Sequence, residues 1–239
     1  MYRNKKMPSK RYNQAFEARN GGEAISLTDA IAALAKFPRA KFDESVDLAM
    51  RLGVDPKHSD QMVRGTVALP NGSGKTVRVA AFAADGPAAD AAKEAGADHV
   101  GLKELMEKVE GGWTDFDVAV ATPEAMKAGV AKLGRQLGPR GLMPTPKAGT
   151  VSDDLGKVIG EVKAGRVEFK VDKSANLQMP IGKVSFDAEK LIENAKAAII
   201  AVLKAKPDST KGTYLMSASL SATMSPSIKL DVKEISKLG

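Results

Sequence analysis

Near the C-terminus of this 239-residue chain, short hydroxyl side chains alternate with apolar side chains. The hydroxyl positions are Ser217, Ser219, Ser221, Thr223 and Ser225, and the apolar positions are Tyr214, Met216, Ala218, Leu220, Ala222 and Met224. A period of two predicts a strand whose apolar side faces the core. The hydroxyls offer short donors and acceptors, which suits close contact with a rigid polar surface such as the minor groove of folded RNA. A solvated strand rich in Ser is the alternative.

The sequence shows no residue pattern typical of catalysis or metal binding. Cysteine is absent, and the two histidines, His58 and His99, stand far apart. Thiolate chemistry and cysteine-ligated zinc are therefore excluded, and neither histidine suggests a metal site. Residues 72–76 read Gly-Ser-Gly-Lys-Thr, but Leu69 stands where a phosphate-binding loop needs its first glycine, and a strand is expected to follow. We expect no catalytic residue, no metal and no cofactor.

The basic residues of the chain are concentrated towards its two ends. Lys and Arg number 36 against 29 Asp and Glu, for a formal charge of +7, yet residues 73–164 hold 12 basic and 13 acidic side chains. This distribution favours a polyanionic partner for the ends. The N-terminal residues Arg3, Lys5, Lys6, Lys10 and Arg11 predict a basic arm and lack the apolar core of a signal peptide. Without an apolar run of about 18 residues or any cysteine, we expect a cytoplasmic protein with no membrane partner.

Both ends of the chain predict helices and antiparallel strands. Ser26 to Asp29 resembles a capping box for a helix that buries Ile31, Leu34 and Ala35, and strands are expected at 46–52 and 66–69. After residue 165, the pattern predicts a hairpin of strands 167–171 and 177–181 with a bulge at Gly182. Asp187 is expected to cap a long helix, which precedes the hydroxyl strand. Its apolar stripe is Leu191, Ile192, Ala195, Ile199, Val202 and Leu203.

The middle of the chain has a different pattern of apolar residues. Short apolar runs at 77–83, 98–100 and 118–121 alternate with helical segments that begin at Pro87, Lys103 and Pro123. Such alternation is typical of a parallel sheet covered on both faces, as in a Rossmann-like α/β unit. The first strand lacks the glycine-rich dinucleotide fingerprint, so the fold by itself implies no cofactor.

Neither end alone has enough elements to enclose a core. The predicted fold class is therefore α+β together with α/β. A split α+β domain, residues 1–72 and 165–239, has an antiparallel sheet formed by both chain ends, and a Rossmann-like α/β domain, residues 73–164, is inserted in it. Gly72 and Gly165 lie at the two crossings and are expected to form a hinge.

Five short motifs extend the interpretation from fold to family. They are KFDE at 41–44, SDQMVRG at 59–65, LGPRGLMP at 137–144, PKAGTV at 146–151 and TMSPS at 223–227. Together they closely resemble the bacterial ribosomal protein L-one family, and the resemblance runs from about residue 11 to residue 230. The family usually has glycine after Thr-Met, whereas this chain has Ser225, whose Cβ is expected to strain the turn or shift the RNA.

The resemblance implies a non-enzymatic, ribosome-associated protein. Its implied partners are 23S rRNA at the base of the mobile stalk, other components of the large ribosomal subunit, tRNA leaving the ribosome, and the messenger RNA of its own operon, whose translation it represses. By the same resemblance, Phe42, Ser217, Thr223 and Met224 are RNA contacts. The basic positions at that surface are Lys41, Lys170 and Lys173. The hydroxyl face adds Ser219 and Ser225 to the expected RNA-binding residues.

Two other classes of function stay open from the residues alone. The inserted α/β domain could belong to a nucleotide-binding enzyme, or it could be a scaffold that recruits protein partners. The first class lacks a recognisable phosphate loop or nucleophile–base pair. Calorimetry with common nucleotides and pull-down with the isolated insert would distinguish them.

Overall fold

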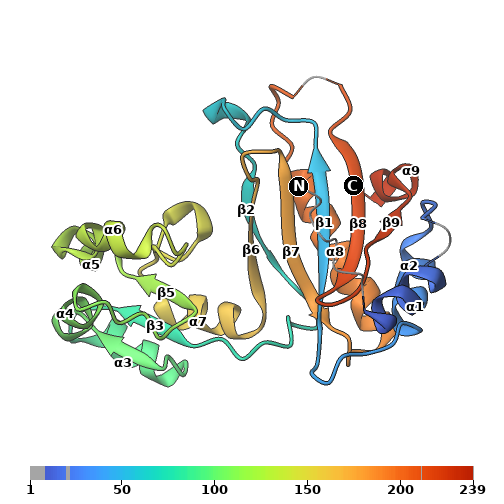
Figure 1. Cartoon of the computed structure of the whole chain (residues 1–239). Coiled ribbons are helices and arrows are strands. Elements are labelled where there is room, and N and C mark those ends of the chain that lie inside the picture. The colour runs from blue at the N-terminus through green and yellow to red at the C-terminus, as the bar shows by residue number, and fades with distance from the viewer. Residues whose placement is uncertain (1–8, 20–21, 211, 239) are drawn as a thin grey trace, which may run out of the picture. The chain divides into compact units, whose positions relative to one another are not determined.

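The computed structural model describes residues 9–19, 22–210 and 212–238 (Figure 1). Arg3, Lys5 and Lys6 of the expected basic arm lie outside these ranges. The chain divides into two compact units: unit 1 is Met1–Gly74 with Val167–Gly239, and unit 2 is Lys75–Arg166. None of the helices within the described ranges is long and apolar enough to cross a lipid bilayer.

Unit 1 is built on a four-stranded antiparallel sheet in the order β7-β1-β8-β9. The strands are β1 (Ser45–Leu52), β7 (Asn176–Lys183), β8 (Leu215–Ala222) and β9 (Ile228–Leu230). Every second side chain of β1, from Val46 to Leu52, is buried, which confirms the strand that its alternation predicted. The buried side chains of the sheet join one core with α2 (Leu27–Ala35) and α8 (Ala188–Lys204). In Figure 1, α8 runs behind β1 and β8, so helices cover one face of this sheet.

Helices α2 and α8 begin where the sequence predicted, with differences in detail. Ser26 Oγ accepts a hydrogen bond from the Asp29 amide at 3.1 Å and so caps α2. Ala35 is exposed rather than buried, because the helix turns Leu27 and Ala30 towards the core instead. Asp187 occupies the N-cap of α8, but its side chain makes no capping bond. It forms an ion pair with Lys190 at 3.0 Å.

The N-terminal segment contains a helix that the sequence interpretation missed. Lys10 and Arg11, expected in a basic arm, lie in α1 (Lys10–Ala18), where Ser9 Oγ accepts a hydrogen bond from the Tyr12 amide. Tyr12, Ala15 and Phe16 form a short apolar stripe on α1, but only Ala15 is buried. The short helix α9 (Val232–Ile235) lies near the other end of the chain.

The expected hairpin after residue 165 is wrong in its pairing. Strand β6 (Arg166–Lys170) pairs with β2 (Arg64–Ala68) in a separate two-stranded sheet. Its continuation meets the start of β7 at the bridge between Val171 and Leu177 and through hydrogen bonds between Asp172 and Asn176. The predicted bulge is confirmed, because Val46 pairs with Gly182 whereas Asp47 pairs with Pro180. Gly182 has φ +156°, and a Cβ there would lie 2.8 Å from Leu191 Cδ2. Glycine allows this close approach of β7 to α8.

Unit 2 has the three-stranded parallel sheet expected from the middle of the chain, in the order β4-β3-β5. The strands are β3 (Val79–Phe82), β4 (His99–Gly101) and β5 (Val118–Ala121). Val79 and Ala81 pack into a core with α3 (Pro87–Glu94) and α7 (Leu155–Lys163), whereas Ala80 and Phe82 pack into a second core with α4 (Lys103–Glu110) and α5 (Pro123–Ala128). Both faces of the sheet are therefore covered. Unit 2 also contains the short helix α6 (Gly134–Leu137).

Four 3₁₀ turns complete the described elements. They are η1 (Ser59–Gln61), η2 (Val130–Leu133), η3 (Pro146–Ala148) and η4 (Ser236–Leu238).

Candidate nucleic-acid interface

The second face of the four-stranded sheet carries short side chains in its centre. Ala49 of β1 lies between Gln178 of β7 and Ser219 of β8, and Ser219 in turn lies opposite Lys229 of β9. All four side chains are half-buried or exposed. A flat region without long side chains therefore lies across the middle strands, and Lys229 adds a positive charge at its edge. A bulky, rigid polar surface can approach such a region closely.

Both ends of this face are more polar. Towards the C-terminal end of β1, Arg51 lies between Asn176 and Ser217. Towards its N-terminal end, Asp47 lies between Pro180 and Ser221. The positive charge of Arg51 suits phosphate groups, whereas the carboxylate of Asp47 opposes them.

The environment of Asp47 acts on its charge in two directions. Burial raises the pKa of Asp47 above its ordinary value, and the charge of Lys183 acts in the other direction. Lys183 Nζ donates a hydrogen bond to Ser45 Oγ at 2.9 Å beside it. A raised pKa means that the folded protein disfavours the charged carboxylate, and an approaching phosphate would disfavour it further.

The predicted alternation in β8 holds only in part. Arg51 pairs with Ser217 but Leu52 pairs with Leu215, so Met216 is an extra residue in the strand and its side chain is 56% exposed. Leu215 takes the buried position that Met216 was expected to fill. Met224 is 52% exposed because β8 ends at Ala222 and the chain turns there. Both methionines therefore lie outside the core.

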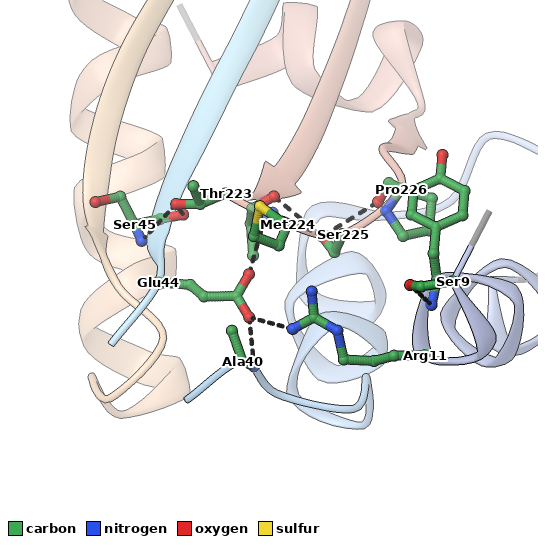
Figure 2. A network of polar contacts seen from close by, with 11 residues as sticks. Ser9, Arg11, Ala40, Glu44, Ser45, Thr223, Met224, Ser225 and Pro226 are labelled. Carbon is green, nitrogen blue, oxygen red and sulfur yellow. Dashed lines mark hydrogen bonds and ion pairs between the residues drawn. The ribbon is translucent and has the colours of Figure 1, made fainter. Parts of the chain in front are cut away.

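Thr223 holds the end of β8 against the start of β1 (Figure 2). The Ser45 amide donates a hydrogen bond to Thr223 Oγ1 at 3.0 Å, and the Thr223 amide donates to the Ser45 carbonyl at 3.0 Å. The hydroxyl also lies 3.3 Å from that carbonyl, to which it donates. Thr223 thus extends the pairing of the two strands to the point where Met224 turns into solvent.

Ser225 does not strain its turn, which was one of the two expected consequences of its Cβ; the other, a shift of the RNA, stays a prediction. Its φ is not positive, since Ala175 is the non-glycine residue with positive φ in the described ranges. Ser225 Oγ accepts a hydrogen bond from the Ala222 amide at 2.9 Å, and the Ser225 amide donates to the Ala222 carbonyl at 3.1 Å. The side chain folds back on its own turn, as Ser commonly does, so a Cβ is accommodated without a glycine.

The predicted site residues fall into two groups along the sheet. Phe42, 54% exposed, and Lys41 precede β1, at the same end as Thr223, Met224 and Ser225. Ser45 and Arg51 are six positions apart along the extended strand β1, which is about 20 Å.

The second group lies near the C-terminal end of β1, and Ser219 lies between the two groups. Ser217 pairs with Arg51, and Lys173 lies in the turn before Asn176, which also pairs with Arg51. Lys170 ends β6, and both lysines are exposed. The candidate interface is therefore an elongated strip rather than a compact pocket.

Three further residues of this face were not among the expected RNA-binding residues: Arg51, Gln178 and Lys229. Their strands were partly predicted from alternation, but the order of the strands was not. The signal that could have found Arg51 is its place opposite Ser217, which requires knowing that β1 pairs with β8.

The two expected hinge glycines have backbone conformations that favour glycine. Gly72 has φ +69° and Gly165 has φ +106°. The peptide before the first crossing is anchored to α8: Asn194 Nδ2 donates to the Gly72 carbonyl at 2.9 Å, and Asn194 Oδ1 accepts from the Asn71 amide at 3.0 Å. Asn194 is fully buried and was read from the sequence only as part of a helix.

Within the residues that the structure describes, no cluster of three or more His, Cys, Asp or Glu side chains could hold a metal ion.

The chain matches known proteins along most of its length. The profile of the ribosomal protein L1p/L10e family matches residues 34–226. The chain is 52% identical to the large ribosomal subunit protein uL1 of Protochlamydia amoebophila over 95% of both chains. It is 53% identical to that of Solidesulfovibrio magneticus, over 96% of this chain and 97% of the relative. It is 55% identical to that of Maridesulfovibrio salexigens, over 93% and 94%. This chain therefore belongs to the ribosomal protein L1p/L10e family.

Proposed function

We propose that the strip running from Phe42 and Met224 to Ser217 and Lys173 binds a folded region of 23S rRNA at the base of the mobile stalk. The chain is a structural protein of the large ribosomal subunit and not an enzyme, as its family and relatives indicate. In this proposal, unit 1 is a split RNA-binding α+β domain and unit 2 is a Rossmann-like α/β domain inserted in it. Unit 1 has one hydrophobic core and unit 2 has a core on each face of its sheet, and no core includes buried residues of both units, which supports this division.

The observation that carries the proposal is the flat centre of the sheet face. Ala49 and Ser219 lie side by side there, so an RNA helix could bring its 2′-hydroxyls within hydrogen-bonding distance of Ser219 and Ser221. Arg51, Lys173 and Lys229 lie where they can meet phosphates. Contacts to 2′-hydroxyls and shape would then give specificity, and contacts to phosphates would give salt-sensitive affinity.

Thr223→Val and Met224→Ala are each expected to weaken binding to a stalk-base rRNA fragment by about 1–3 kcal/mol. Valine cannot accept the hydrogen bond from the Ser45 amide, so the strand end loosens. Alanine at 224 removes an exposed apolar side chain beside the strip. Titration of each variant with the fragment at several salt concentrations measures the loss.

Lys173→Ala serves as the matched comparison. It is expected to lower the slope of log binding constant against log salt concentration by about one, because one phosphate contact is lost. It is also expected to weaken binding to all RNAs alike. An unrelated hairpin of equal length, bound as tightly as the rRNA fragment by the natural protein, would refute the proposal. Unchanged affinity in both strand-end variants would remove that end from the interface.

The same strip would also bind a similar structure in the messenger RNA of the protein's own operon and thereby repress translation. This proposal is supported by the resemblance to bacterial members that act in this way. Excess rRNA fragment should displace the messenger fragment, whereas simultaneous binding of both would contradict a shared site. Contact with tRNA leaving the ribosome is a further expectation, which rests on the resemblance alone.

We also propose a hinge at the crossings near Gly72 and Gly165. Because Asn194 anchors the Gly72 peptide to α8, movement is expected in the residues that follow it. The chain has no cysteine, so Ala128→Cys in unit 2 and Ala188→Cys in unit 1 give clean sites for spin labels. A broad distance distribution is expected in the free protein, and one fixed distance with and without RNA would contradict the hinge.

A further inference from the structure

Glu44 is buried at the end of the strip, where a negative charge is costly. Its exposed fraction is 5%. The other buried polar residues in the described ranges, Thr122, Asn194 and Thr210, carry no charge. Its two carboxylate oxygens have different partners (Figure 2): Oε1 accepts a hydrogen bond from the Ala40 amide at 2.8 Å, and Oε2 accepts one from the Met224 amide at 2.9 Å. One carboxylate therefore joins two segments that are 184 positions apart in the sequence.

These two segments carry the two exposed apolar side chains at this end of the strip. Ala40 lies two residues before Phe42, and Met224 is itself the second apolar contact. The neighbouring hydrogen bonds between Ser45 and Thr223 fix the ends of β1 and β8, but they do not involve the segment before Glu44. Within this network, the carboxylate of Glu44 is the group that bonds to both segments at once.

Arg11 of α1 completes the arrangement. Its Nη1 lies 3.6 Å from Glu44 Oε1, and Figure 2 shows its side chain reaching from α1 towards the carboxylate. A buried carboxylate is tolerated when hydrogen bonds and an opposite charge satisfy it. Two backbone amides and the Arg11 guanidinium satisfy the carboxylate of Glu44. Helix α1 therefore helps to stabilise this end of the strip.

We propose that Glu44 is a positioning residue for RNA recognition, which holds the Phe42 and Met224 segments at the spacing that the RNA requires. This inference rests on the proposed RNA-binding function and deepens it. Glu44 contacts no RNA in this scheme, because both of its oxygens face backbone amides of the protein. Its effect on affinity is transmitted through the two segments that it joins.

The sign of the effect separates positioning from simple electrostatics. Removing one negative charge close to a polyanion should strengthen binding if charge alone matters. Removing the bridge should weaken binding if Glu44 acts by position. Glu44→Ala therefore makes opposite predictions under the two explanations.

The experiment compares Glu44→Ala and Glu44→Gln with Glu17→Gln, which neutralises an exposed glutamate on α1. Each full-length variant is titrated with the stalk-base rRNA fragment at several salt concentrations. Glu44→Ala is expected to bind about tenfold or more weakly, the effect of losing hydrogen bonds to a charged group, with an unchanged salt slope. Glu44→Gln keeps one acceptor oxygen and is expected to recover part of the loss. Glu17→Gln is expected to bind as tightly as the natural protein or more tightly.

A second readout needs no RNA. The methyl resonance of Met224, assigned with Met224→Leu, is expected to shift and broaden in free Glu44→Ala because its amide loses its anchor. Thermal unfolding checks that each variant is folded. If Glu44→Ala does not fold, the RNA affinity and the Met224 resonance of Glu44→Gln test the inference in its place.

Affinity of Glu44→Ala equal to or above that of the natural protein, or an unaltered Met224 resonance, overturns the inference. Failure of the natural protein to prefer the rRNA fragment overturns the proposed function instead, and the Met224 resonance still reports on positioning.

Discussion

Ala49→Glu is expected to abolish specific RNA binding while the protein stays folded. Ala49 lies in the middle of the flat sheet face, between Gln178 and Ser219. A glutamate there would hold an RNA helix away from the face and place a negative charge against its phosphates. Like charges brought together at an interface cost several kcal/mol, so a loss of about 100-fold or more in affinity is expected. RNA titration measures the loss, and thermal unfolding checks the fold.

Two variants control this prediction. Ala49→Ser keeps the side chain short and is expected to bind like the natural protein. Ala188→Glu introduces the same side chain and the same charge at an exposed position of α8, which packs on the other face of the sheet. It is expected to leave affinity nearly unchanged. Equal losses from Ala49→Glu and Ala188→Glu would mean that net charge, and not the sheet face, determines binding.

Asn194→Ala is expected to destabilise unit 1 by about 3 kcal/mol, since three backbone groups lose their partners. Besides its bonds to Asn71 and Gly72, the buried Asn194 amide donates to the Ile181 carbonyl at 2.8 Å. Ile181 lies at the bulge of β7, so one side chain connects α8, the sheet and the first crossing between the units. Hydrogen exchange of the protected amides in β1 and β7 measures the free energy of opening.

Glu193→Ala is the matched control for this prediction. Glu193 Oε2 accepts a hydrogen bond from Asn71 Nδ2 at 2.8 Å, but this bond is exposed to solvent. Water can replace it, so a loss of at most about 1 kcal/mol is expected. Equal effects of the two substitutions would show that burial of the Asn194 amide does not matter to stability.

The alternation of side chains predicted a strand correctly where the sequence also marked the position of its bulge. The change of parity around Gly182 revealed the bulge in β7 because a glycine stood at the break. The extra residue Met216 in β8 had no such marker, since Leu215 and Met216 are both apolar and either could face the core. Helix α1 was missed because its apolar residues Tyr12, Ala15 and Phe16 span little more than one turn between polar and charged neighbours, which is too short a stripe to recognise.

The candidate site was harder to predict because its geometry depends on contacts between distant parts of the chain. The resemblance pointed to Phe42, Thr223 and Met224, but not to the bond from Ser45 to Thr223 or to the bridge made by Glu44. Asn194 in a helix reads as a solvated polar residue, and its partner Gly72 lies 122 positions away. Pairing of strands and burial of polar groups are properties of the folded chain, so single segments cannot reveal them.

A photo-cross-linking side chain at position 219 shows most directly where the RNA lies. Ser219 is at the centre of the flat face, next to Ala49. Cross-linking from position 219 to the stalk-base rRNA fragment is expected, with none from the same group placed at position 188 on α8. Cross-links from position 188 and none from position 219 would contradict RNA binding by this face of the sheet.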